Sequence, residues 1–583
     1  MSMQNNGIRL IGHVTSGTID RISVRLHVSP KSVREGTFLK IKDGEDEYLG
    51  LLTDFELNAT NPKYTEGFGL GQTPDHIAKL IKGQIFSSNI IFHPSLSLYG
   101  NKVYPIRNIP EHLAPVYIAS AEDIRAVFGD PSDPANFVIG TTREDKHPVC
   151  LNLDKLVQRS SGVFGASGTG KSFTVRMILA GLIHYDQASI LVLDMHNEYG
   201  LDDIASDTGE RVTGLKTKFP AKVRVVSVGA GTTIRGNTPD FNLEIPSSDI
   251  TTGDIELLTE ELGLKETTST TLAALYTEFG QSWFKAFRMM KVGAVIPEDP
   301  TKPNSRMIPA PDSVAAWANK AGVNSIAAEG LHSKMERVFH RPYVNHKPAV
   351  NGISEVIKML EDGKHVVLSF GDNDSDLDYM LVSNILTRRI RQAWECKTNA
   401  YRNKSTNKTG APRPLTIVVE EAHKLLCPAL ANQTTFGTIA REMRKYFVTL
   451  MIIDQRPSQI SSEVLSQIGT RVSSWLGDDD DIQSTLAGLP GKEALRGMLS
   501  RLRPKEEALL MGWGVSMSMP VKTRRYDSRF WKELLGNIPI TSGMSATGST
   551  PISPDTSGTP SQEVDNTDEP KPSTDKLLKG LGW

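Results

Sequence analysis

The chain has 583 residues and a formal net charge of -2, from 65 basic and 67 acidic side chains. This balance excludes a protein that binds nucleic acid through an overall basic surface, so any DNA contact would come from a local patch. At roughly 100–200 residues per domain, the length predicts about three or four domains.

The cysteines and the apolar runs indicate the compartment. The three cysteines, Cys150, Cys396 and Cys427, lie far apart and lack paired metal-site spacing, which favours small buried side chains in a reducing compartment. The first residues, MSMQNNGIRLIGHV, lack the basic region and long apolar core of a secretory signal. No apolar run approaches the roughly 18 residues that a membrane helix needs. We therefore expect a cytoplasmic protein with no membrane partner.

Residues 1–120 are predicted to form a small β domain. In RISVRLHV, residues 21–28, apolar and polar side chains alternate with the period of a half-buried strand. Further on, an Asp-Gly turn at residues 43–44 separates two strand-like runs. Several short strands with turn signals are typical of a barrel or a sandwich. We expect an N-terminal β-barrel here.

From about residue 148 the pattern changes to strands that are followed by helices. Continuous apolar runs of this kind fit strands covered on both faces, as in a parallel α/β sheet. The runs are SILVLDM, VRVVSV, KHVVLSF, LTIVVEE and VTLMIID. We expect an α/β core over residues 121–250 and 345–539.

Two segments do not follow this pattern. Residues 251–344 contain helical stretches such as IELLTEELG and SVAAWANKAG, and we interpret them as a helical insertion, with a separate lobe as the alternative. Residues 540–583 are rich in Ser, Thr, Pro, Gly and Asp, which predicts a disordered tail. The tail ends in DKLLKGLGW, either a docking motif on a flexible tether or a frayed end.

The stretch GASGTGKS matches the phosphate-binding loop pattern G-x-x-x-x-G-K-[ST]. An apolar strand precedes it and FTVRMILAGLI continues as a helix, so nucleotide binding is favoured over a simple glycine-rich turn. In such a loop the lysine contacts the β- and γ-phosphates of ATP, and the final hydroxyl is a ligand of Mg²⁺. The predicted nucleotide-binding residues are Gly165, Ala166, Ser167, Gly168, Thr169, Gly170, Lys171, Ser172 and Phe173, with Ser172 also on the metal.

Two adjacent acids follow the apolar strand in TIVVEEAHKLL. A site of this kind needs a carboxylate for the magnesium and a residue that orients the attacking water. We assign Glu420 to the metal, through water, and Glu421 to the attacking water. The usual metal-binding residue at this position is Asp, so Glu420 is a departure. The alternative is a solvated strand end.

VTLMIIDQRPSQI is another apolar strand with polar residues at its end. Gln455 is our candidate for sensing the γ-phosphate, although a polar residue that starts a loop would look the same. The preceding TIAREMRKYF places Arg441 and Arg444 on one face of a helical segment. An arginine there could stabilise the transition state, often from the next subunit, and a solvated basic face is the alternative.

Two further groups have open interpretations. Asp194, His196 and Glu198 follow a strand in LDMHNEYG, and a loop near the nucleotide is favoured over a metal site because no second His or Cys cluster joins them. The basic stretch at residues 387–408 could face phosphates, but a basic surface helix and loop explains it equally well.

Together these motifs resemble the HerA family of hexameric DNA-translocating ATPases, within the HerA/FtsK branch. The resemblance rests on GASGTGKS, LDMHNEYG, VVEEAHKLL, AREMRKYFVTLMIIDQRPSQI and VLSQIGTRVSSWL, in family order between about Gly140 and Tyr526. It implies a RecA-like core, a barrel and a helical insertion, with six subunits in a ring around duplex DNA.

The resemblance also implies roles for individual residues. ATP would lie between neighbouring subunits, and Arg444, or Arg441 as the second choice, would complete the site of the next subunit. Glu421 would be the catalytic acid and Gln455 the sensor. The usual family sequence AREGRK reads AREMRK here, with Met443 in place of Gly, and this change affects the local backbone that presents the arginine.

The sequence thus predicts an ATP-hydrolysing, ring-shaped DNA translocase or helicase, in DNA-end processing or antiphage defence. By resemblance its partner is a NurA-like or other nuclease, or a sirtuin-like NAD hydrolase, since nothing in this chain resembles those active sites. The alternative is an ATP-gated scaffold that assembles and activates such an effector with little translocation. A third reading, a conjugation or secretion ATPase, is less favoured because no membrane segment is evident.

Overall fold

The computed structural model describes residues 9–59, 86–100, 102–143, 146–205, 209–302, 304–403 and 410–536. The predicted tail, residues 540–583, lies outside the described residues. No helix in these described ranges is long and apolar enough to cross a membrane.

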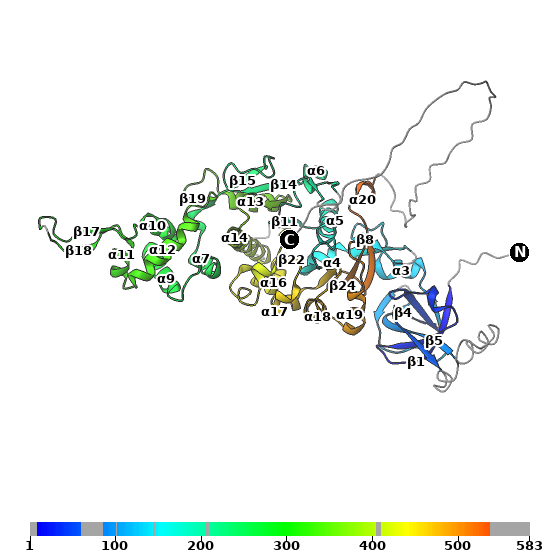
Figure 1. The fold of residues 1–583 in the computed structure, drawn as a ribbon. Helices are drawn as coiled ribbons and strands as arrows, with labels where there is room; N and C mark the ends of the chain where they lie inside the picture. Colours follow the sequence, from blue (N-terminus) through cyan, green and yellow to red (C-terminus); the bar gives the residue numbers. More distant parts are fainter. Residues whose placement is uncertain are drawn as a thin grey trace, which may run out of the picture. The chain divides into compact units, whose positions relative to one another are not determined.

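The N-terminal strands form a closed barrel, which Figure 1 draws in blue. Neighbouring strands follow the order β2-β1-β7-β3-β4-β5, and β5 pairs back with β2, which closes the ring. The strand β6 extends the sheet beyond β5. The bounds are β1 (Leu10–Gly17), β2 (Ile22–Leu26), β3 (Phe38–Asp43), β4 (Asp46–Ala59), β5 (Phe86–Tyr99), β6 (Lys102–Pro105) and β7 (Pro115–Ile118).

The barrel interior follows the predicted alternation. Ile22 and Val24 of β2 are buried and pack with Ile41 and Phe92 in one hydrophobic cluster. The sequence pattern fits either a barrel or a sandwich. The structure is a barrel because β2 and β5 pair antiparallel, which leaves neither strand as an open edge.

The second sheet forms the predicted α/β core, in the order β15-β14-β20-β11-β21-β22-β10-β23-β24-β25-β8-β9. Its strands are parallel from β15 to β23, and antiparallel pairs join β24, β25, β8 and β9 at the other side. The bounds are β8 (Asn136–Thr141), β9 (Pro148–Asn152), β10 (Ser161–Phe164), β11 (Ser189–Asp194), β14 (Val223–Val228), β15 (Phe241–Leu243), β20 (His365–Ser369), β21 (Leu415–Val419), β22 (Val448–Asp454), β23 (Thr470–Ser473), β24 (Glu507–Gly512) and β25 (Met519–Thr523).

The apolar runs predicted from the sequence form adjacent central strands of this sheet. Successive residues of β11 pack on opposite faces: Leu191 and Leu193 belong to one hydrophobic cluster, Ile190 and Val192 to another. This alternation explains why the runs have no polar positions, since both faces are covered. The helix α5 (Lys171–His184) packs in the second cluster, whereas α13 (Gly352–Glu361), α14 (Asp376–Arg402) and α16 (Thr435–Glu442) pack in the first.

Helices fill most of the segment between β15 and β20, drawn in green in Figure 1. The segment leaves the core at β16 and returns at β19, and these two strands pair in parallel. Trp283, Phe284 and Phe339 pack among its helices in the same cluster as α14. The bounds are β16 (Ile245–Pro246), α7 (Thr252–Glu256), α8 (Thr259–Leu262), α9 (Thr267–Phe279), α10 (Trp283–Met289), α11 (Val314–Ala321), α12 (Ser325–Phe339) and β19 (Val344–Asn345).

The segment also contains one short hairpin that the helical prediction did not include. Its strands β17 (Val295–Pro297) and β18 (Met307–Pro309) pair antiparallel and expose apolar side chains. The remaining described helices are α3 (Ala121–Phe128), α4 (Leu153–Gln158), α6 (Leu215–Lys218), α15 (His423–Leu426), α17 (Ser462–Gln467), α18 (Asp479–Leu486), α19 (Lys492–Ser500) and α20 (Ser528–Leu534), with a short pair β12 (Asp203–Ile204) and β13 (Arg211–Val212).

Two helical glycines give opposite predictions. A Cβ at Gly437 in α16 would lie 1.6 Å from the carbonyl oxygen of Ala431, whereas a Cβ at Gly330 in α12 meets no atom within 4 Å. We expect Gly437→Ala to lower the free energy of unfolding by about 1–3 kcal/mol, because the backbone must move. We expect the matched control Gly330→Ala to raise it by about 0.5–1 kcal/mol, because the unfolded chain loses freedom. Denaturant unfolding of both variants checks this, and equal effects would contradict the packing at Gly437.

Candidate functional site

The predicted phosphate-binding loop connects β10 to α5. β10 lies between β22 and β23 and is parallel to both, and α5 begins at Lys171. Gly168 and Gly170 have φ values of +71° and +95°, which favour glycine over residues with a side chain. The α5 N-terminus therefore follows a loop whose backbone is shaped by its glycines, which is the arrangement that binds phosphate.

Internal hydrogen bonds hold the loop. The Thr169 hydroxyl and the Lys171 ammonium both donate to the carbonyl oxygen of Ala166, at 2.7 and 3.2 Å. The Ala166 amide donates to the carbonyl of Trp475 and the Lys505 amide to that of Thr169, at 3.0 and 3.1 Å. Burial lowers the pKa of Lys171, and the Glu421 carboxylate is the largest of the opposing electrostatic effects. Lys171 and Glu421 are thus electrostatic neighbours.

Glu420 and Glu421 have different environments although they are adjacent. Glu420 is only 5% exposed, and its Oε2 atom has no hydrogen-bond partner among the described residues. Burial, followed by the nearby Asp194, raises the pKa of Glu420 well above its usual value. The Tyr379 hydroxyl donates to the Glu420 carbonyl at 2.6 Å, which fixes the backbone there.

These residues fit a magnesium ion. Magnesium takes hard oxygen ligands, and both Ser172 at the start of α5 and the buried Glu420 offer them. The orphaned Oε2 atom of Glu420 is a buried acceptor that an ion or an ordered water would satisfy. The donor set predicted from the sequence is therefore chemically suited to the ion.

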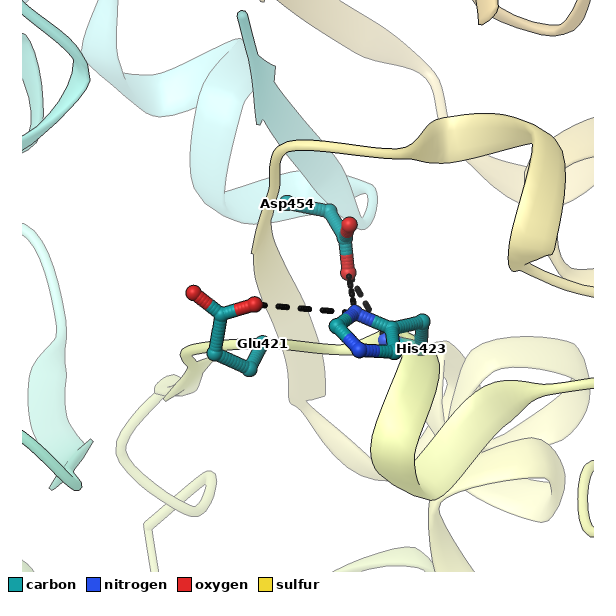
Figure 2. A group of neighbouring side chains, drawn as sticks. All are labelled: Glu421, His423 and Asp454. Carbon is teal, nitrogen blue, oxygen red and sulfur yellow. Dashed lines mark hydrogen bonds and ion pairs between the residues drawn. The ribbon is translucent and has the colours of Figure 1, made fainter. Parts of the chain in front are cut away.

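Glu421 lies at the point where the strand turns into α15, with the left-handed φ of +44°. Its Oε1 atom accepts a hydrogen bond from the Gln455 side chain at 3.1 Å, so two residues predicted from separate strands meet. The structure adds His423 and Asp454, whose Nδ1 and Oδ2 atoms are 3.0 Å apart (Figure 2). The hydrogen bond with Asp454 raises the pKa of His423.

Sequence reasoning missed His423 and assigned no role to Asp454. The available signals were weak: a histidine two residues after the acid pair, and an acid at the last position of an apolar strand. Glu421, His423 and Asp454 bring potential ligand atoms within 4.8 Å of one another, a group found among the described residues.

The two predicted arginines differ in their contacts. Arg441 donates to the Asn432 side chain at 3.0 Å and lies 3.7 Å from a Glu463 carboxylate oxygen. Arg444 is exposed, and no hydrogen bond or ion pair involves its guanidinium in the described part of the chain. The single helical face expected for the pair is interrupted, because α16 ends at Glu442 and a 3₁₀ turn follows in which Met443 is buried in the core.

The other polar groups singled out in the sequence have structural contacts. The buried Asp194 accepts hydrogen bonds from the amides of Glu198 and Tyr199 at 2.7 and 3.0 Å, so it holds the loop after β11. Burial raises its pKa to about 6.

In the basic stretch, which is described as far as residue 403, several cations are paired within the chain. Arg388 pairs with Asp254 at 2.8 Å and Lys397 with Glu361 at 2.7 Å. Much of this stretch is therefore used for internal contacts, and residues 404–408 lie outside the described residues.

The chain is similar to several known proteins. Residues 137–390 match the family model described as "Helicase HerA, central domain". The chain is 26% identical over 423 residues to the DNA double-strand break repair helicase HerA of Sulfolobus acidocaldarius, covering 71% of this chain and 74% of the relative. It is 23% identical to the protein of the same name from Sulfurisphaera tokodaii, covering 89% and 94%. The structure of VirB4 from Thermoanaerobacter pseudethanolicus covers 67% of this chain and 97% of its own, with a TM-score of 0.41 and 17% identity.

Removing the Lys171 ammonium tests the phosphate-binding loop. We expect Lys171→Ala to weaken ATP binding roughly ten- to a hundredfold, because a charged hydrogen bond to phosphate is lost. Calorimetric titration with a non-hydrolysable ATP analogue measures the affinity. The exposed Lys532 on α20 provides a control, and Lys532→Ala should bind as the wild type does. Unchanged affinity in Lys171→Ala would show that this loop does not bind the nucleotide.

Proposed function

We propose that this chain, a P-loop ATPase whose residues 137–390 match the central domain of the HerA helicases, is an ATP-driven, ring-shaped DNA translocase or helicase. The observation that carries the proposal is the contact between Glu421 and Gln455 at the ends of neighbouring parallel strands, with Glu421 electrostatically coupled to Lys171. A water-orienting acid, a sensor amide and a phosphate-binding lysine are the groups that ATP hydrolysis requires.

The residues would divide the work as follows. Lys171 binds the β- and γ-phosphates, and the loop amides cradle them at the start of α5. Ser172 and Glu420 would hold Mg²⁺, which when bound neutralises phosphate charge. Glu421 orients and polarises the attacking water, and Gln455 holds one oxygen of Glu421 through the bond at 3.1 Å. Movement of Gln455 toward the γ-phosphate would link nucleotide state to the catalytic acid.

We propose that the active site is shared between copies of the chain in a homo-hexamer. Arg444 is exposed and its guanidinium contacts none of the described residues, which supports a role in the neighbouring site, whereas Arg441 contacts Asn432 and Glu463. An arginine supplied in trans stabilises the charge that develops during phosphoryl transfer. We therefore prefer Arg444 to Arg441 as the residue that reaches the next subunit.

The substrate and partners are inferred from the relatives. Two of them are named as DNA double-strand break repair helicases. We propose that this chain moves along duplex DNA together with a nuclease or another effector protein, in DNA-end processing or antiphage defence. Contacts to phosphates would make the movement insensitive to sequence and sensitive to salt.

The first test is steady-state ATP hydrolysis with and without linear duplex DNA. We expect DNA to stimulate turnover, and the stimulation to weaken as salt is raised, because backbone contacts release counterions. Glu421→Gln should bind ATP normally and lose about 10²–10⁴-fold in kcat. Hydrolysis that ignores DNA at every salt concentration would favour the ATP-gated scaffold instead.

Mixing experiments test the shared site. Arg444→Ala alone should lower kcat by about 10³-fold or more, because transition-state charge is left uncompensated. Adding Lys171→Ala subunits, themselves inactive, should recover part of the turnover, since their Arg444 can serve an intact neighbouring site. Arg441→Ala is the matched comparison and should be less impaired. A failure to recover activity at any mixing ratio would argue against an arginine supplied in trans.

A further inference from the structure

Asp454 is a buried carboxylate with three donors. Its side chain is 0% exposed, and its Oδ2 atom accepts hydrogen bonds from the backbone amide and the ring Nδ1 of His423, at 2.7 and 3.0 Å. Its Oδ1 atom accepts from the Arg456 amide at 2.7 Å. Because a carboxylate only accepts hydrogen bonds, the His423 Nδ1 atom carries the hydrogen in this contact. The imidazole is therefore fixed in position and in tautomer.

The same nitrogen faces the catalytic acid. The His423 Nδ1 atom lies 3.6 Å from the Oε2 atom of Glu421. Figure 2 shows the ring lying next to both carboxylates. The other oxygen of Glu421 is held by Gln455 at 3.1 Å. Glu421 is thus flanked on one side by an amide from the loop after β22 and on the other by an imidazole anchored on the end of that same strand.

Glu421 needs such contacts to keep its conformation. A φ of +44° is unfavourable for a residue with a side chain, and it persists only where the surroundings enforce it. The Ala422 amide donates to the carbonyl of Ile453 at 3.3 Å, which ties this turn to β22 just before Asp454. The hydrogen bonds from His423 to Asp454 are a second tie between this turn and the end of β22.

A metal ion is a poorer explanation of this cluster. A cation bound by Glu421, His423 and Asp454 would need the Oδ2 atom of Asp454, which already accepts two hydrogen bonds from His423. Binding through Nδ1 would also need the unprotonated form of the atom that donates to Asp454.

We propose that His423 is a positioning residue for ATP hydrolysis: anchored on Asp454, it fixes where the Glu421 carboxylate lies relative to the attacking water. This inference rests on the proposed function, in which Glu421 orients that water. His423 acts through Glu421 and does not itself contact substrate, so its loss should affect turnover and not nucleotide binding.

Side-chain replacements that imitate one ring nitrogen at a time test the proposal. An asparagine amide nitrogen can occupy the place of Nδ1, whereas a glutamine amide nitrogen occupies that of Nε2. We expect His423→Ala and His423→Gln to lose roughly ten- to a hundredfold in kcat, the effect of one charge-assisted hydrogen bond. His423→Asn should keep kcat within a few-fold of wild type. In all three, the KM and the affinity for a non-hydrolysable ATP analogue should stay near wild type.

A double-mutant cycle separates positioning from a general structural effect. In a Glu421→Gln background, His423→Ala should cause little further loss of kcat, because the carboxylate it positions is already gone. An equal loss in both backgrounds, or equal damage from Asn and Ala, would overturn the inference. So would wild-type turnover in His423→Ala.

The wild-type chain distinguishes the two levels of the proposal. If it hydrolyses ATP and His423→Ala matches it, only the positioning role is wrong. If the wild-type chain binds ATP and does not hydrolyse it with or without DNA, the proposed function fails and this inference fails with it.

Discussion

Parallel strands β10, β21 and β22 end side by side, and the charges placed at that edge constrain the surrounding structure. Glu420, Glu421 and Asp454 lie there close to Lys171, and burial opposes the charged form of both Glu420 and Lys171. Isolated buried charges are costly, whereas opposite charges near each other offset part of that cost. The edge is therefore suited to phosphate and a divalent cation, which would supply further compensating charge.

Adjacent carboxylates at this edge are separated by the backbone. Glu420 continues the strand into the protein interior beside Asp194 and Tyr199, where burial favours its neutral form. Glu421 turns out of the strand through its left-handed φ and meets Gln455 and His423 instead. A single peptide unit thus gives two residues of the same type different partners, which is what a division between metal binding and water activation would require.

The helical insertion does not change the order of the core strands. The helical segment leaves at β16 and returns at β19, which pair, so its ends are adjacent and the core strands on either side keep their order. In the N-terminal domain, the β2–β5 pairing closes the ring of the barrel, so neither of these strands is an open edge.

Features that depend on local pattern were predictable from the amino-acid sequence. Three local features carried these predictions: the glycine spacing before Lys171, the apolar runs of the parallel strands, and the acid pair that begins at Glu420. They reflect backbone freedom, strand burial and residue type, which act over a few positions. The α/β core and the β structure of the N-terminal domain were predictable for this reason, whereas closure of the barrel depends on the long-range β2–β5 pairing.

Tertiary structure decided what depends on contacts between distant residues. His423 and Asp454 meet only because β21 and β22 lie in parallel register, with Val419 opposite Ile452. Arg388 belongs to the basic stretch that could face phosphates, but it forms an ion pair with Asp254 that no local pattern predicts. The strand order and the engagement of Arg441 belong to the same class. Pairing partners and burial are properties of the folded chain. Residues of the same type therefore differ in role only after folding has given them different neighbours.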